Sequence, residues 1–112
     1  MNLPNARYAR VEKEKITGYL LSTTSPDGRG KAKFFFRFGF RVDQWQNLAD
    51  ALRVQGTSHK VVEIVETAFG PRYHVDGIIE TPDGRNPKIK TVWQVDIGSN
   101  SPRLITAHPL GG

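Results

Sequence analysis

The pattern of apolar residues changes once along the chain, near residue 60, and this change constrains the fold more than any other feature. Before it, apolar residues recur at the three- and four-residue spacing typical of helices. After it, they alternate with polar residues, as in strands that bury one face. The sequence predicts an α+β fold with two to three N-terminal helices packed on one face of a four-stranded antiparallel β-meander.

The length of 112 residues suits one domain with one core. We expect an extended arm at residues 1–10, a helical half at 11–56 and a sheet half at 60–109. The sequence has no cysteine, which excludes disulfides and thiolate zinc sites. No apolar run approaches the roughly 20 residues that cross a bilayer, and the first ten residues lack the apolar segment of a signal peptide. We therefore expect a cytoplasmic protein that does not bind membranes.

Residues 43–55 carry the clearest helical pattern, and a weaker helix is expected at 12–21. In the clear helix Asp43 is placed to cap the first turn, and Gly56 is expected to end it. The residues of its apolar stripe, which we expect in the core, are Trp45, Leu48, Ala49 and Leu52.

Residues 31–40, KAKFFFRFGF, fit both a strand and a helix. In a strand, every second residue from Phe34 to Phe40 would share a face. In a helix, Lys33 and Arg37 would share a face and Gly39 would end it. Alternation slightly favours the strand, so the residues alone leave both structures open.

The expected strands are residues 61–68, 72–80, 88–96 and 103–108. Their alternation places Trp93 in the core. The opposite face is expected to present Arg72, His74, Lys88 and Lys90, bordered by Thr106 and His108.

The net charge of +5 equals the charge of one stretch, residues 29–41, which contains five basic residues and no acid. Such a local cluster attracts phosphate. It can also be an ordinary solvated surface that keeps the protein soluble. The residues that we expect to bind nucleic acid are Arg29, Lys31, Lys33, Arg37, Arg72, Lys88, Lys90 and Arg103.

The sequence shows no metal-ligand spacing, no nucleophile elbow and no complete phosphate loop, so we expect neither a metal nor a cofactor. Metal-free cleavage of RNA needs only a general base, a general acid and a cation that stabilises the phosphorane-like charge. The candidates for these roles and for substrate positioning are His74, His108, Lys33, Arg85 and Thr106.

Four segments, KAKFF from residue 31, TPDGR from 81, TVW from 91 and PRLITA from 102, resemble an uncharacterised family of small bacterial domains. That family occurs in toxin–antitoxin and polymorphic-toxin contexts, and its layout is similar to the barnase–EndoU–colicin–RelE ribonuclease superfamily. The resemblance implies that residues 31–40 belong to the helical half. The chain departs from the family pattern at His108, where the pattern has tyrosine, and His74 lies outside the pattern. The residues that the resemblance implicates are Lys31, Lys33, Arg85, Thr91, Arg103 and Thr106.

Three functions remain open from the sequence. The first is a metal-independent endoribonuclease toxin that acts on tRNA or mRNA and is inhibited by a small acidic antitoxin. The alternative is a non-catalytic module that binds RNA or protein, such as an antitoxin, immunity or adaptor protein. The third is a structural or phage-associated domain.

Overall fold

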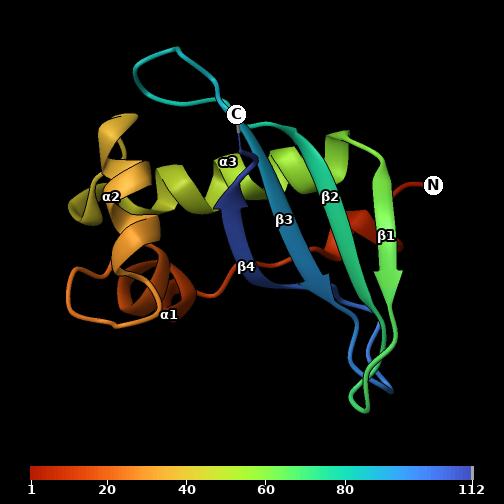
Figure 1. The fold of residues 1–112 in the computed structure, drawn as a ribbon. Coiled ribbons are helices and arrows are strands. Elements are labelled where there is room, and N and C mark those ends of the chain that lie inside the picture. Colours follow the sequence, from red (N-terminus) through yellow and green to blue (C-terminus); the bar gives the residue numbers. More distant parts are fainter. Residues whose placement is uncertain (112) are drawn as a thin grey trace.

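The computed structural model describes residues 1–111, and all its helices precede its sheet (Figure 1). The helical elements are η1 (Ala6–Tyr8), α1 (Lys13–Lys15), η2 (Ile16–Leu20), α2 (Arg29–Arg37), η3 (Val42–Gln44) and α3 (Trp45–Ser58). The strands are β1 (Val61–Val65), β2 (Arg72–Ile78), β3 (Lys88–Gln94) and β4 (Arg103–Pro109). The expected α+β fold class is confirmed.

The four strands form one sheet in the order β1-β2-β3-β4, and each neighbouring pair is antiparallel. Short links allow this meander, since antiparallel neighbours need only a tight turn. The β1–β2 turn closes through two backbone hydrogen bonds of 3.2 Å between Thr67 and Gly70. Gly70 has a φ of 124°, a conformation that residues with a Cβ atom rarely adopt.

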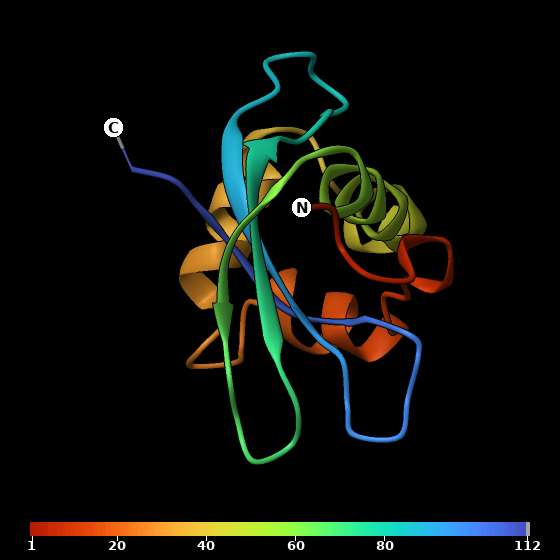
Figure 2. The ribbon, with the colours of Figure 1, turned by 90° about the vertical axis from the view of Figure 1, so that its right-hand side faces the viewer.

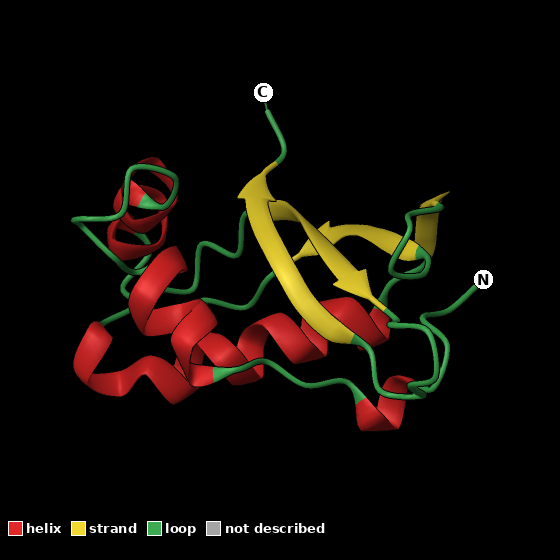
Figure 3. Ribbon diagram, turned by 90° about the horizontal axis from the view of Figure 1, so that it is seen from below, coloured by secondary structure: helices red, strands yellow, loops and turns green. Residues whose placement is uncertain are grey.

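The helix α3 lies across one face of the sheet, while α2 stands beside β4 and extends toward the other face (Figures 1 and 2). Viewed from below, the long helix runs beneath the strands, and no helix of the described residues 1–111 covers the centre of the opposite face (Figure 3). We call that opposite side the open face. The core between sheet and helices includes the fully buried side chains of Ile16, Leu20, Phe35, Leu48, Leu52, Ile89 and Trp93.

Residues 31–37 lie in α2, so the prediction from the family resemblance that this segment belongs to the helical half is confirmed. The segment packs its rings against one another: Phe34 and Phe38 lie 4.9 Å apart between centroids, and Phe35 and Phe40 lie 6.0 Å apart. Gly39 follows the helix with a φ of 100° and stops it, as expected.

The prediction that Gly56 ends the long helix is wrong, because α3 continues to Ser58. Gly56 instead allows a close approach to the sheet: a Cβ atom there would lie 2.4 Å from Cζ2 of the buried Trp93 ring. The neighbouring Gln55 also joins α3 to the sheet. Its amide nitrogen donates to the carbonyls of Val75, Gly77 and Ile89, and its oxygen accepts from the Thr91 hydroxyl at 2.6 Å.

Further expectations differ in detail from the structure. The arm at residues 1–10 is not extended throughout, because η1 forms one turn in it. The second and third strands end at Ile78 and Gln94, two residues earlier than expected. Asp43 makes no side-chain cap, because its carboxylate accepts two hydrogen bonds of 3.0 and 3.1 Å from Arg41. The helix expected at 12–21 is divided, since a wider turn closed by the Leu21 amide and the Ile16 carbonyl at 2.8 Å follows α1. The first strand ends at Val65, where the β1–β2 turn begins.

Candidate functional site

Two rows of polar side chains cross the open face of the sheet. In the first row, Glu63 on β1 lies opposite His74 on β2, His74 opposite Val92 on β3, and Val92 opposite Thr106 on β4. Val92 is 5% exposed and forms the floor between the two polar neighbours. Since adjacent strands are about 4.8 Å apart, the backbones of His74 and Thr106, two strands apart, are separated by roughly 10 Å.

The second row lies two residues further along the strands. Asp76 on β2 lies opposite Lys90 on β3, and Lys90 opposite His108 on β4. Lys90 donates to the Asp76 carboxylate at 2.7 Å, and both side chains are largely buried, with 18% and 28% exposure. The pair therefore holds the lysine rigidly beside His108.

The helical half completes the site at the β4 edge. The Tyr19 hydroxyl lies 2.9 Å from the Thr106 hydroxyl, and either oxygen can be the donor. The Lys31 ammonium lies 5.5 Å from the centre of the Tyr19 ring, and the Lys15 ammonium lies 5.1 Å from it. Lys31 forms no ion pair with any described residue, so its charge remains available to an anion.

His108 sits among cations. Partial burial lowers the pKa of its imidazole below the ordinary value, and the nearby charges of Lys31, Lys90 and His74 lower it further, while Asp76 opposes them. An imidazole of this kind is neutral near pH 7 and can accept a proton.

His74 has a different environment. Its Nδ1 atom is buried and has no hydrogen-bond partner among the described residues, and the Glu63 carboxylate lies 3.6 Å away from it. A break in the β1–β2 register between Val61 and Glu63 sets the position of that carboxylate. Bulges of this type often redirect side chains beside functional sites.

Two more of the predicted basic residues lie on the open face. Arg72 precedes His74 by two positions on β2, and its guanidinium donates to the Gln94 side chain at 2.9 Å. Lys88 is exposed at the start of β3. Together with His74 and Lys90 they share the face opposite Trp93, as alternation implied.

Two predicted residues are engaged elsewhere. Arg85 donates to Asp83 at 2.6 Å and to the Arg37 carbonyl at 2.6 Å, so it fastens the β2–β3 loop to the end of α2. Arg103 donates to Asp96 at 2.7 and 3.2 Å. The structure does not bring either guanidinium together with the histidines.

The cations of α2 divide between two sides of that helix. Lys31 faces Tyr19 and the sheet, while Arg29 and Lys33 lie one helical turn apart on another side. They line a separate hollow of about 400 Å³ together with Thr23 and Phe36. Lys33 is therefore not beside the histidines. Arg37 is exposed at the end of the helix.

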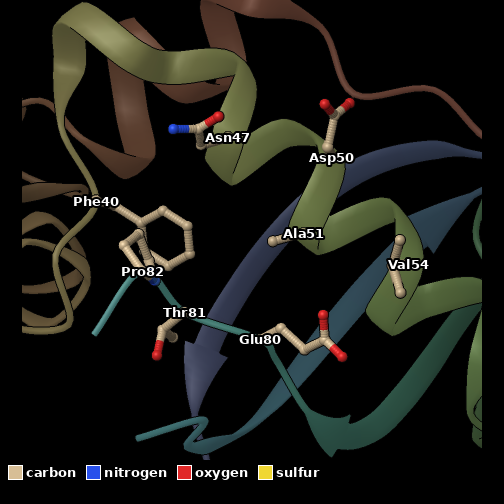
Figure 4. Close-up of a pocket in the computed structure, with 8 residues that line it drawn as sticks. All are labelled: Phe40, Asn47, Asp50, Ala51, Val54, Glu80, Thr81 and Pro82. Carbon is tan, nitrogen blue, oxygen red and sulfur yellow. The ribbon is translucent and has the colours of Figure 1, made fainter. Parts of the chain in front are cut away.

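A further hollow of about 400 Å³ lies between α3 and the segment after β2 (Figure 4). Its charged side chains are the carboxylates of Asp50 and Glu80, so it is unsuited to a phosphate. Its lining residues are Phe40, Asn47, Asp50, Ala51, Val54, Glu80, Thr81 and Pro82.

Sequence reasoning missed three residues of the site. Tyr19 lies in the weaker helix expected at 12–21, and no local signal connects it with Thr106, which lies 87 positions away. Asp76 shares a face of β2 with His74 by alternation, but the sequence does not show that it pairs with Lys90. Glu63 depends on the register break in β1, which alternation does not reveal.

Within residues 1–111, no group of three or more His, Asp or Glu side chains is arranged to hold a metal ion. No helix in that part of the chain is long and apolar enough to cross a membrane. The open face and its β4 edge nevertheless combine His108, whose pKa is lowered, with the imidazole of His74 and the ammonium of Lys31. This set can move protons and stabilise negative charge on a phosphodiester.

Comparison with solved structures shows that the chain is similar in fold to a chain of a known complex. It is a contact-dependent growth inhibition toxin–immunity protein complex from Klebsiella pneumoniae 342, matched with a TM-score of 0.74 over 96% of this chain and 98% of that chain. At 18% identity, the likeness establishes a shared fold. Comparison with curated proteins gives no match.

The sequence itself matches a family over residues 2–111. The family is described as a domain of unknown function, DUF6883. Because the match spans nearly the whole chain, the protein belongs to the DUF6883 family.

Proposed function

We propose that the protein is a toxin-type endoribonuclease that cleaves RNA without a metal ion. The observation that carries the proposal is that His74 and His108 share the open face, while Lys31 of α2 lies at its β4 edge, where its charge helps to lower the pKa of His108. When the 2′-hydroxyl of RNA attacks the adjacent phosphate, the reaction requires only a general base, a general acid and a cation.

In this mechanism His108 is the general base. It takes the proton from the 2′-hydroxyl, and the resulting oxygen attacks the adjacent phosphorus. Lys31 stabilises the negative charge that develops on the phosphate oxygens, since it has no carboxylate partner among the described residues. His74 protonates the leaving 5′-oxygen. The products are a 2′,3′-cyclic phosphate and a free 5′-hydroxyl.

Two other contacts support substrate placement. The hydrogen-bonded hydroxyls of Tyr19 and Thr106 lie at the β4 edge and can contact the ribose or a phosphate oxygen. Arg72 lies on the same strand as His74 and can bind the neighbouring phosphate, since its present partner is the uncharged Gln94.

The toxin part of the proposal rests on the shared fold with a contact-dependent growth inhibition toxin–immunity complex. A toxin that cuts cellular RNA needs an inhibitor in the cell that makes it. The net charge of +5 and the basic stretch 29–41 favour a small acidic protein partner. The similarity to the barnase–EndoU–colicin–RelE superfamily remains a prediction, as does action in a bacterial cytoplasm.

A second candidate is a non-catalytic immunity or antitoxin protein. Exposed apolar side chains near β1 favour it: Val62 is 55% exposed, Phe69 68% and Ile97 78%, and the last two are joined by a backbone hydrogen bond of 2.9 Å. Exposed apolar patches often mark protein interfaces. This candidate predicts binding without cleavage and normal growth on expression.

The experiment that separates the two candidates is inducible expression with RNA profiling, followed by incubation of purified protein with RNA and a chelator. The endoribonuclease proposal predicts growth arrest and chelator-insensitive cleavage. The variants His74→Ala, His108→Ala and Lys31→Ala should each abolish both effects. His59→Gln is the matched control, because His59 lies at the end of α3 and bonds to the Gln55 carbonyl.

Normal growth together with intact RNA at high protein concentration would contradict the proposal. Equal cleavage by wild type and by His108→Ala would also contradict the assigned roles. Circular dichroism on each variant confirms that lost activity does not reflect lost fold.

A further inference from the structure

The hollow beside α2 is separate from the histidine site. Arg29 and Lys33 lie one turn apart, Phe36 follows on the same side of the helix, and Thr23 closes the hollow from the preceding loop. Its volume of about 400 Å³ lies within the range of small-molecule sites. Both cations are exposed, and neither forms an ion pair within residues 1–111.

The ring of Phe36 is unlike those of its neighbours. Phe34, Phe35, Phe38 and Phe40 pack ring against ring, whereas Phe36 takes part in no such pair among the described residues. It is partly buried against the core and partly open to the hollow. A fixed aromatic ring beside two unpaired cations suits a flat base joined to a phosphate.

The position of the hollow relates it to the candidate site. Lys31 lies between Arg29 and Lys33 in sequence but on the other side of α2, where its charge lowers the pKa of His108. An α-helix with its side chains is about 10–12 Å across. A strand of a few nucleotides can therefore cross α2 from the histidines to the hollow.

We propose that the hollow binds one nucleotide of a single-stranded RNA, at a position a few nucleotides from the cleaved bond. The base stacks on Phe36, and Arg29 and Lys33 bind its phosphates. The RNA must be single-stranded, because a paired and stacked base cannot reach the ring. This inference rests on the proposed function and assigns α2 the role of selecting the substrate.

Binding tests the hollow independently of cleavage. The probe is a fluorescent hexanucleotide of 2′-O-methyl RNA, which cannot be cut, measured by anisotropy at constant salt. Phe36→Leu keeps an apolar side chain but removes the flat ring, and it should weaken binding about tenfold. Arg29→Ala/Lys33→Ala removes both exposed cations and should weaken binding at least as much. Arg53→Ala, an exposed arginine on α3, is the control and should bind as wild type does.

Cleavage rates then test whether the hollow binds a nucleotide several positions away from the cleaved bond. A hexanucleotide should be cut faster than a dinucleotide by wild type, and Arg29→Ala/Lys33→Ala should remove this advantage while leaving the dinucleotide rate unchanged. A dinucleotide that is never cut refutes the proposed catalysis but not the hollow. Unchanged hexanucleotide binding by both variants overturns the hollow, whatever the cleavage rates are.

Discussion

Replacement of Gly56 by alanine tests how α3 is seated on the sheet. The added methyl group would lie 2.4 Å from Cζ2 of Trp93 and 2.6 Å from both Cε2 and Nε1. The ring has no room to retreat, because it is fully buried and its Nε1 donates to the Thr91 hydroxyl at 2.8 Å. The substitution must therefore push the helix away from the sheet or break that hydrogen bond.

The expected loss follows from two opposing effects. Overpacking a buried site costs about 1–3 kcal/mol, and a clash with a rigid ring lies at the upper end of this range. Alanine gains about 1 kcal/mol over glycine in helix propensity. The free energy of unfolding should fall by about 2 kcal/mol, which corresponds to a melting temperature lower by about 8 °C for a domain of this size.

Thermal denaturation followed by circular dichroism measures this loss. The control is Gly18→Ala, because Gly18 lies in η2 and a Cβ atom there would meet nothing within 4 Å. The control should be as stable as wild type or more stable by up to about 1 kcal/mol. Equal melting temperatures for the two variants would refute the described contact between α3 and Trp93.

Three further predictions concern the core, a surface ion pair and the site. Gln55→Leu removes the amide that joins α3 to β2 and β3, and the urea midpoint should fall by an amount equivalent to about 2 kcal/mol with an unchanged m value. The hydrogen bond from Arg103 lowers the pKa of Asp96, so this pair stabilises the fold above the carboxyl's unfolded-state pKa and loses its effect as pH falls through the lower folded value. In melts taken across that acidic range, Asp96→Asn should therefore lose less stability than wild type. Because the pKa of His108 is lowered, cleavage should persist when the pH is lowered below about 6.5. A cleavage rate that has already fallen before the pH is lowered to that value would argue against His108 as the base.

The strands could be predicted because their side chains alternate between a buried and an open face. This regularity placed His74 and Lys90 correctly relative to Trp93. The pattern of residues 31–40 did not determine that α2 covers most of them, since five phenylalanines in seven positions satisfy either period. Only its packing against the core decides between the two structures.

The remainder of the site depends on contacts that no local pattern contains. Tyr19 meets Thr106 only after the helices fold against β4. Gly56 was predicted to end α3 because glycine is common at the ends of helices. In the structure, glycine is required at this position because the Trp93 ring approaches so closely. The charge of Arg85 suits a phosphate, but its guanidinium instead donates hydrogen bonds to Asp83 and to the carbonyl at the end of α2.

The most direct test of the central claim is the chemistry of the cleaved ends. Purified protein would be incubated with RNA and a chelator, with the equivalent 2′-deoxy oligonucleotide as control, and the products analysed by mass spectrometry. The mechanism through His108 and His74 predicts 2′,3′-cyclic phosphate and 5′-hydroxyl ends from RNA and no cut in the deoxy control. Intact RNA, or products with a 5′-phosphate, would contradict the account.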